Sequence, residues 1–499
     1  METQQTQASS YRQIARSTGI FGGSQAINMV IGAVRTKVVA LLLGTGGVGL
    51  LGLYQSVIEM IQSVTSLGLG FSAVKDISQA VGRNDDTSVA RTAQTVRRWI
   101  GFTAVAGALL TIAFSKEISR LAFHDTAHAL PISFLSFAVF AGTLASGLRT
   151  ILQGLRRIGD MAKASVAGTL LSAVGFIVLF FLFGEDGIIP ALLTASLITL
   201  AVSVFYVWKV KLPKLRQTWR TSLRDGRKMV VLGIYSVTVG LCGALSMVLV
   251  KSHIGARSDM DTVGLFQSAW TLSAWAVTTI LTAMSADYYP RLCAVSDDGP
   301  LMRKYVAEQV RVGLLLAGAV VVGMLLFSPL VLRLFYSSRF VPAEPMLRWQ
   351  MAGSLLTALN WPLSFVVLSR GKGWLFCLTE VLWDVLYVAL AALLWPLAGL
   401  EGVGMAYFAA HVVYTAVLLF IVRKECAYRP EAGNVRLEVM FFALAAAAFL
   451  IAAFVQAPAV KYPAAAAVFL LTAALALYEF NRIVPLAECW HKLFPKRHG

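Results

Sequence analysis

Charged residues are scarce in this sequence, and their scarcity excludes a soluble globular protein. They make up 14% of the 499 residues, whereas about a quarter of a typical soluble chain is charged. Hydrophobic residues make up 57%, and long apolar runs recur from one end of the chain to the other. The composition therefore predicts an all-α polytopic membrane protein, because helices satisfy their own backbone hydrogen bonds inside a bilayer.

The sequence also lacks the motifs of common catalytic and metal sites. It has no Walker loop, no nucleophile motif and no cluster of metal ligands, and its five cysteines show no CxxC spacing. The first residues, METQQTQASSYRQIARS, contain no short apolar core followed by a small-residue cleavage site, so we expect no cleaved signal peptide. We expect the protein to be no enzyme and to carry no cofactor or metal.

Fourteen apolar segments are long enough to cross a bilayer, since one crossing needs about 20 residues. Their approximate ranges are 17–43, 48–74, 98–122, 130–154, 161–184, 187–209, 229–253, 262–288, 309–334, 345–369, 373–397, 401–422, 438–457 and 462–482. With the N-terminus in the cytoplasm, 32 of the 43 Lys and Arg residues fall on the cytoplasmic side, 8 on the opposite side and 3 within spans. This bias predicts that both termini are cytoplasmic. Because the net charge of +17 arises in these short loops, we expect no nucleic-acid partner.

The two halves of the chain repeat each other. Residues 52–56 (GLYQS) return as 264–268 (GLFQS), 120–123 (RLAF) as 333–336 (RLFY), and Gly184-x-x-Gly187 as Gly399-x-x-Gly402. Six spans separate the copies, so both keep the same orientation, as in transporters built from parallel repeats. We therefore predict two pseudo-symmetric six-helix lobes and two extra C-terminal helices. The predicted domains are an N-lobe at 1–211, a basic cytoplasmic linker at 212–228, a C-lobe at 229–425, and a C-terminal part at 426–499.

Basic residues inside the predicted spans indicate a polar cavity, because a charge at membrane depth costs about 2.5–3.5 kcal/mol. Arg35 shares one helix face with Gln25 and Asn28, and it is the first candidate for the cavity. Lys37 lies about 200° around the helix from Arg35, so its alternative is to extend toward the outer interface.

Four more residues complete the candidate substrate site. Arg149 falls near the inner end of the fourth span, and Lys251 ends the seventh, where a single lysine extending to the interface is the alternative. Gln55 and its repeat counterpart Gln267 are also candidates, although hydrogen bonding between helices is the favoured interpretation for glutamines.

Four acids are candidates for ion coupling. Glu59 lies in the second span, where neutralising Arg35 is an equally good interpretation, and Asp287 ends the eighth, where a local ion pair is the alternative. Glu380 and Asp384 fall on one face of the eleventh span, and two acids so close favour proton uptake. Neutralisation by Arg370 and Lys372 is the alternative. His411 has no evident partner in the sequence, and we interpret it as a satisfied core residue rather than a proton relay.

Several short motifs together resemble a known transporter family. They are Gly46-x-x-Gly49-Leu50-x-Gly52-Leu53-Tyr54-Gln55, Ser66-Leu67-Gly68-Leu69-Gly70, Asp261-x-Val263-Gly264-Leu265-Phe266-Gln267, Asp287-Tyr288-Tyr289-Pro290-Arg291-Leu292, and Phe340 through Trp349-Gln350. Their order and spacing are similar to those of the Wzx flippases, the polysaccharide-transporter branch of the MOP exporter superfamily, to which the MATE transporters also belong. The resemblance covers roughly residues 12–425.

The resemblance implies transport of an undecaprenyl-diphosphate-linked oligosaccharide repeat unit across the bacterial inner membrane. Such units supply the assembly of O-antigen, exopolysaccharide or a similar polymer, in cooperation with polymerase and chain-length machinery. Family members are thought to alternate access and to use an H⁺ or Na⁺ gradient, as antiporters do. Two alternatives stay open, a lipid II-type flippase and a MATE-like cation or drug exporter. A membrane enzyme such as a glycan polymerase is disfavoured, because the predicted outer loops reach only about ten residues.

Overall fold

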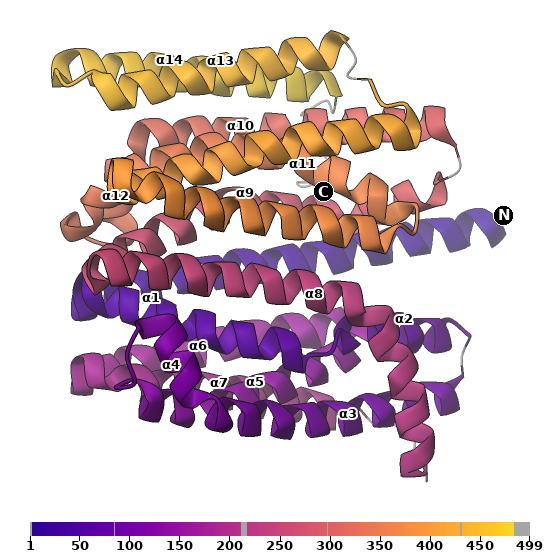
Figure 1. Ribbon diagram of the computed structural model, residues 1–499. Helices are drawn as coiled ribbons and strands as arrows, with labels where there is room; N and C mark the ends of the chain where they lie inside the picture. Colours follow the sequence, from indigo (N-terminus) through magenta and orange to yellow (C-terminus); the bar gives the residue numbers. More distant parts are fainter. Residues whose placement is uncertain (1, 84, 211–216, 297, 430–431, 484–499) are drawn as a thin grey trace, which may run out of the picture. The chain divides into compact units, whose positions relative to one another are not determined.

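The computed structural model describes residues 2–83, 85–210, 217–296, 298–429 and 432–483, and every regular element in them is helical (Figure 1). The all-α prediction is therefore confirmed for the described part of the chain. The helices are α1 (Glu2–Thr65), α2 (Leu69–Gly82), α3 (Asp86–Ala113), α4 (Ser115–Phe123), α5 (Ala129–Gly154), α6 (Ile158–Phe183), η1 (Gly184–Gly187), α7 (Ile188–Trp208), α8 (Trp219–Arg257), α9 (Met260–Ala294), α10 (Gly299–Phe335), η2 (Ser338–Ala343), α11 (Glu344–Ser369), α12 (Gly373–Cys426), α13 (Ala432–Phe454) and α14 (Pro458–Ile483).

Ten helical segments of the described chain are long and apolar enough to cross a membrane. Three of them have 43, 51 and 54 residues, about twice the length that one crossing needs. Each of the three contains a glycine with positive φ, namely Gly44, Gly184 or Gly399. A left-handed backbone ends a helix and favours glycine, which has no Cβ to clash. Each long segment is therefore two helices joined at a glycine.

Three of the predicted spans are interrupted: 309–334 is kinked at Phe327, and the other two also have wrong predicted ends. The span predicted at 48–74 stops at Thr65, because Leu67 and Gly68 both have positive φ, and α2 begins at Leu69. The span predicted at 98–122 is broken at Phe114, which separates α3 from the short α4. Apolar residues continue across the first break, so hydropathy could not locate it, whereas Ser115-Lys116-Glu117 directly after Phe114 are a polar signal for the second.

The chain divides into two compact units. Unit 1 comprises residues 1–264 with 335–339, and unit 2 comprises residues 265–334 with 340–499. In the structure α8 packs with unit 1, on α1, α2 and α3, although the sequence analysis assigned residues 229–253 to the second lobe. The predicted domain boundaries themselves stay a prediction.

Unit 1 is built around α5, against which α2, α3, α4 and α7 all pack. α1 packs on α6 and α8. One hydrophobic cluster joins α2, α3, α5 and α8, and it includes the fully buried Ile77, Val96 and Ile151. These contacts fix the helices that carry Arg35, Arg149 and Lys251.

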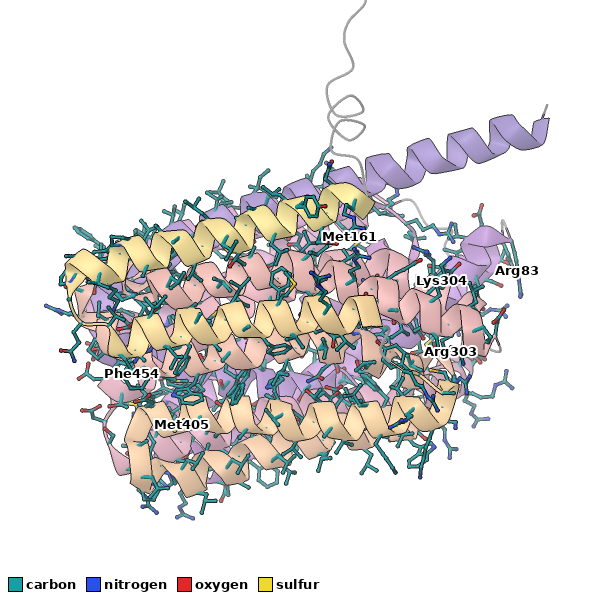
Figure 2. All side chains as sticks on the ribbon, turned by 90° about the horizontal axis from the view of Figure 1, so that it is seen from above. Arg83, Met161, Arg303, Lys304, Met405 and Phe454 are labelled. Carbon is teal, nitrogen blue, oxygen red and sulfur yellow. The ribbon has the colours of Figure 1, made fainter. Side chains whose placement is uncertain are left out.

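Unit 2 combines α9–α12 with the C-terminal hairpin of α13 and α14. α11 packs on α12, and the two halves of α12 pack on each other, as the contact between Trp383 and His411 shows. The hairpin lies along α10 (Figure 1), where Phe441 is fully buried against Gly318. Arg303 and Lys304 mark one end of unit 2, and Phe454 marks the other (Figure 2).

The sequence repeat is confirmed in the local backbone. Gly184 (φ 57°, ψ −130°) and Gly399 (φ 54°, ψ −129°) have nearly identical conformations, and so do Phe114 (φ −101°, ψ 15°) and Phe327 (φ −112°, ψ 16°). Gly187 and Gly402 also have matching surroundings. A Cβ on Gly187 would overlap the carbonyl of Leu179, and a Cβ on Gly402 would overlap the carbonyl of Leu394, which is the repeat counterpart of Leu179. The same residues therefore turn or break the helices in both copies.

Candidate functional site

Lys251 of α8 is buried inside unit 1, with 4% of its surface exposed. Its Nζ donates hydrogen bonds to the carbonyl of Gly52 at 2.9 Å and to Oγ of Ser56 at 2.7 Å, both on α1. The alternative that Lys251 extends to the membrane interface is therefore wrong. An ammonium group in this position needs such partners, because burying an unpaired charge is very costly.

Glu59 lies one turn after Ser56 on α1, and its side chain is exposed. It interacts electrostatically with Lys251, whereas the sequence suggested Arg35 as the group it would neutralise. The structure thus assembles an acid, a lysine and a serine from two helices of unit 1. The sequence separation of 195 residues between Ser56 and Lys251 explains why no local pattern revealed this group.

Arg35 is half-buried on the first half of α1, and its guanidinium carbon lies 5.1 Å from the centre of the Phe176 ring on α6. On the same face of α1, Nδ2 of Asn28 donates to Oγ of Ser165 on α6 at 2.7 Å. A cation over an aromatic ring is held by the ring's electrons while its in-plane N–H groups stay available. Arg35 is therefore positioned by α6 and retains donors for an anion.

The other predicted substrate residues are spread over α1, α5 and α9. Arg149 is exposed on α5, and Lys37 and Gln55 are half-buried on α1. Gln267 donates to Oγ1 of Thr271 at 3.0 Å, within its own helix. Their assignment to a substrate site stays a prediction.

Two of the sequence motifs meet in unit 1, which the sequence analysis did not predict. Oγ1 of Thr45 donates to the carboxylate of Asp261, and Gly49 crosses Gly264 at close range. A Cβ on Gly49 would overlap the carbonyl of Met260, and a Cβ on Gly264 would overlap the carbonyl of Thr45. The glycines of both motifs are therefore needed where α1 and α9 touch.

The acid pair of unit 2 lies on the first half of α12. Glu380 accepts a hydrogen bond from the hydroxyl of Tyr414 at 2.5 Å, and Asp384 is buried, with 6% of its surface exposed. Tyr414 belongs to the second half of the same helix, so the turn at Gly399 brings the two together. Tyr414 was not predicted from the sequence, because a separation of 34 residues carries no local pattern that identifies a partner.

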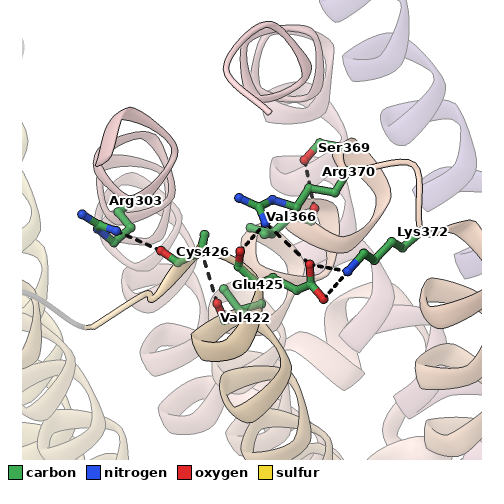
Figure 3. A network of polar contacts seen from close by, with 8 residues as sticks. All are labelled: Arg303, Val366, Ser369, Arg370, Lys372, Val422, Glu425 and Cys426. Carbon is green, nitrogen blue, oxygen red and sulfur yellow. Dashed lines mark hydrogen bonds and ion pairs between the residues drawn. The ribbon is translucent and has the colours of Figure 1, made fainter. Parts of the chain in front are cut away.

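Arg370 and Lys372 do not neutralise this acid pair. Both bind Glu425 at the end of α12, with N–O distances of 3.7 Å and 2.7 Å (Figure 3). The alternative that they pair with Glu380 and Asp384 is therefore wrong. The side chain of Asp287, the remaining acid of the predicted coupling site, lies outside the described residues.

His411 is a buried core residue with three polar contacts. Its Nε2 lies 2.9 Å from Oγ1 of Thr357, and the indole N–H of Trp383 donates to its Nδ1 at 3.1 Å. Nδ1 also lies 3.0 Å from the carbonyl of Tyr407. The interpretation of His411 as a satisfied core histidine is confirmed.

Comparisons with known proteins agree with this architecture. The lipid III flippases of Escherichia coli (strain K12) and Shigella flexneri are each 20% identical to the chain over 405 residues, which is 80% of this chain and 96% of the relative. An inward-facing multidrug resistance MATE family transporter of the MOP superfamily has a TM-score of 0.65 at 19% identity, covering 81% of this chain and 97% of that one. The lipid II flippase MurJ in an inward closed conformation also has a TM-score of 0.65, at 12% identity, covering 93% of this chain and 99% of that one.

At these identities the solved structures show a shared fold. The family itself is shown by a model described as "Polysaccharide biosynthesis protein", which matches residues 38–345. The motifs that suggested the family resemblance lie largely within this range. The chain therefore belongs to this polysaccharide biosynthesis protein family and has the fold of the MOP superfamily transporters.

Proposed function

We propose that this protein is a flippase that moves an undecaprenyl-diphosphate-linked oligosaccharide from the cytoplasmic to the periplasmic leaflet of the bacterial inner membrane. The observation that carries the proposal is family membership together with cationic side chains at membrane depth in unit 1, above all Arg35. Similarity to lipid III flippases over nearly their whole length supports a lipid-linked substrate. O-antigen or exopolysaccharide assembly is the pathway class that would use such a unit.

Electrostatics explains why such a substrate needs basic groups. A diphosphate carries about two negative charges, and an isolated ion in hydrocarbon costs tens of kcal/mol. Guanidinium groups bind phosphate oxygens in pairs and would lower this barrier, while the prenyl chain stays in lipid. With the cytoplasm negative, moving two such charges outward is favoured by about 4–5 kcal/mol per 100 mV.

In this proposal the basic residues of unit 1 have different roles. Arg35 and Arg149 contact the diphosphate, because Arg35 keeps N–H donors and Arg149 is exposed. Lys251 holds α8 on α1 through Gly52 and Ser56, with Glu59 as its counter-charge. Lys37, Gln55 and Gln267 are secondary candidates that contact the sugars.

The proposed architecture has fourteen spans. Twelve form two six-helix lobes that alternate access, two more follow at the C-terminal end, and both termini are cytoplasmic. The ten long apolar segments, three of them double and joined at a positive-φ glycine, account for thirteen crossings, and the 35-residue α9 is the proposed fourteenth. The matching backbone at Gly184 and Gly399 supports two related lobes.

Ion coupling is proposed at Glu380 and Asp384, with Glu59 and Asp287 as further candidates. Support comes from the ion pairs of Arg370 and Lys372 with Glu425, whereas Glu380 accepts a hydrogen bond from the neutral hydroxyl of Tyr414. An H⁺ or Na⁺ gradient would then act on unit 2.

A lipid II-type flippase is the second candidate, because the lipid II flippase structure covers 93% of this chain against 81% for the MATE transporter. The lipid II flippase structure thus matches a larger share of this chain than the MATE structure does. A MATE-like drug or cation exporter is disfavoured, since it would need acids without basic partners in the first lobe, and Glu59 interacts with Lys251.

The test is a deletion of the gene followed by analysis of the lipid-linked oligosaccharides that accumulate on the cytoplasmic leaflet. We expect an undecaprenyl-diphosphate repeat unit, and we expect Arg35→Ala to fail to restore export at normal membrane abundance. Arg423→Gln, which removes an exposed charge at the end of α12, is the matched control and should restore export fully. Accumulation of lipid II would select the second candidate, and full activity of Arg35→Ala would remove Arg35 from the mechanism.

A further inference from the structure

A cavity of about 390 Å³ opens between α9 and α10 of unit 2. Its lining is polar and basic for a site on membrane helices, with Arg291 on α9 and Tyr305, Gln309 and Arg311 on α10. Glu308 is the one acidic residue of the lining, and its side chain is exposed. None of these residues belongs to the proposed transport site.

Arg291 is positioned in the cavity by an aromatic ring. Its guanidinium carbon lies 4.6 Å from the centre of the Tyr305 ring. Stacking uses the face of the guanidinium, and its five N–H donors lie in the plane. Arg291 is therefore suited to a further anionic partner beside the ring.

Arg311 already binds an anionic oxygen. Its side chain is 33% exposed and forms an ion pair with Glu479 of α14, whose carboxylate also accepts from Arg482 at 3.2 Å. Glu479 is not itself part of the lining, and its ion pair shows that the guanidinium of Arg311 binds a carboxylate beside the cavity. It also means that any other anion has to compete with Glu479 for Arg311.

The cavity lies near the basic end of unit 2. Arg303 and Lys304 follow the start of α10 and gather at that end (Figure 2), and Tyr305 comes directly after them. The charge bias of the sequence assigns this end to the cytoplasm. Basic pockets between membrane helices on the cytoplasmic side are suited to anionic lipid head groups.

We propose that this cavity binds the phosphate of an anionic phospholipid of the inner leaflet, held by Arg291 and Arg311 and in competition with Glu479. Binding would exchange the Arg311–Glu479 ion pair for an Arg311–phosphate contact and loosen α14 at its C-terminal end. The inference goes beyond the transport function and does not depend on it.

The test uses the purified full-length protein in neutral detergent, titrated with short-chain phosphatidylglycerol and followed by native mass spectrometry. We expect Arg291→Gln and Arg311→Gln each to weaken binding about fivefold, the equivalent of about 1 kcal/mol for one basic group near an anionic surface. Arg423→Gln removes the same charge outside the cavity and should leave binding unchanged.

Glu479→Gln gives a result of opposite sign. Removing the competing carboxylate should tighten phosphatidylglycerol binding several-fold, whereas a merely structural Glu479 would leave binding unchanged or weaken it. Phosphatidylcholine and inorganic phosphate separate the possible ligands, and we expect neither to displace phosphatidylglycerol at equal concentration. Equal binding by wild type, Arg291→Gln and Arg311→Gln, or displacement by inorganic phosphate alone, would overturn the proposal.

Discussion

Phe114 in unit 1 and Phe327 in unit 2 have almost the same backbone conformation but different surroundings. Each is followed by a serine, and each interrupts its helix with ψ near 15°. Phe114 is 53% exposed, and a separate helix follows it. Phe327 instead packs edge-on against Phe469 of α14, with ring centres 5.7 Å apart. The repeated sequence sets the break, and the packing around it differs between the copies.

The C-terminal hairpin therefore acts as a brace on α10 that unit 1 lacks within its described residues. Phe441 occupies the space beside Gly318, Phe469 packs beside Gly323, and Glu479 binds Arg311. Near the start of α10, Nδ2 of Asn434 donates to the carbonyl of Ala307 at 2.8 Å. These contacts extend along α10 from its first turns to its kink, and four tests follow from the difference.

The largest expected effect comes from Phe441→Ala. The side chain is fully buried, and truncating a buried phenylalanine costs about 3–5 kcal/mol. The matched control is Phe454→Ala on the same helix, where the side chain is 74% exposed and the change should be small. Thermal unfolding in detergent measures both. Equal midpoints for the two variants would show that the hairpin does not stabilise α10.

The second test replaces the turn glycines, Gly184→Ala and Gly399→Ala. Both positions have positive φ near 55°, and a Cβ there should cost about 1–3 kcal/mol. Because the two backbones match, the two losses of stability should agree within measurement error. Gly101→Ala in α3 is the control, since an added Cβ meets no atom within 4 Å and alanine favours a helix. Unequal losses of stability for the two variants would show that the two turns are not equivalent.

The third test compares Phe469→Ala with Phe114→Ala. Removing the edge-on partner of Phe327 should cost about 1 kcal/mol, the usual contribution of an aromatic pair. Phe114 is exposed, so its truncation should change the free energy of unfolding by less than about 0.5 kcal/mol. A larger loss at Phe114 than at Phe469 would contradict the proposed brace.

The smallest effect concerns two helix caps at equivalent positions. Asp85 accepts from the backbone N–H of Ser88 and Asp298 from that of Leu301, both at 2.9 Å. Asp85 also accepts from the hydroxyls of Ser88 and Thr87, and these bonds hold the pKa of its carboxyl below the ordinary value. We expect Asp298→Ala to cost about 1 kcal/mol, a typical value for a cap.

Asp85→Ala should cost more than Asp298→Ala at neutral pH. Because the folded-state pKa of Asp85 is lowered, its contribution is present above the unfolded-state pKa of about 3.9 and is lost as the pH falls below it. The gap in thermal midpoint between wild type and Asp85→Ala should therefore shrink between pH 5 and pH 3. A gap that widens on acidification would refute the proposed role of the carboxylate.

Much of the fold was predictable from the sequence because it depends on local properties. Apolar runs predicted the helices. Gly184 and Gly399 helped to predict the repeat, because a backbone with positive φ favours glycine and the turn is therefore visible in the sequence. The break at Leu67 was missed because apolar residues continue across it, and the break at Phe114 was missed although the polar run Ser115-Lys116-Glu117 follows it. Hydropathy measures composition and carries no information on backbone conformation.

The partners of the buried charges were not predictable for a different reason. Lys251 and Ser56 are 195 residues apart, and Lys372 and Glu425 are 53 apart. Helical spacing relates residues within a few turns, so the sequence identified the charged residues but assigned some of them the wrong partner. Tertiary packing decides which charges meet.

The bracing of α10 by the last two helices has a consequence for synthesis. All of unit 1 except residues 335–339 has left the ribosome once Gly264 has, whereas α10 must wait for α14, which ends at Ile483. At about 5–20 residues per second, the stretch of about 150 residues from the end of α10 at Phe335 to Ile483 takes roughly 7–30 s. During that interval the kink at Phe327 is inserted without its cover, so nascent chains arrested before residue 483 should be the preferred substrates of membrane quality-control proteases.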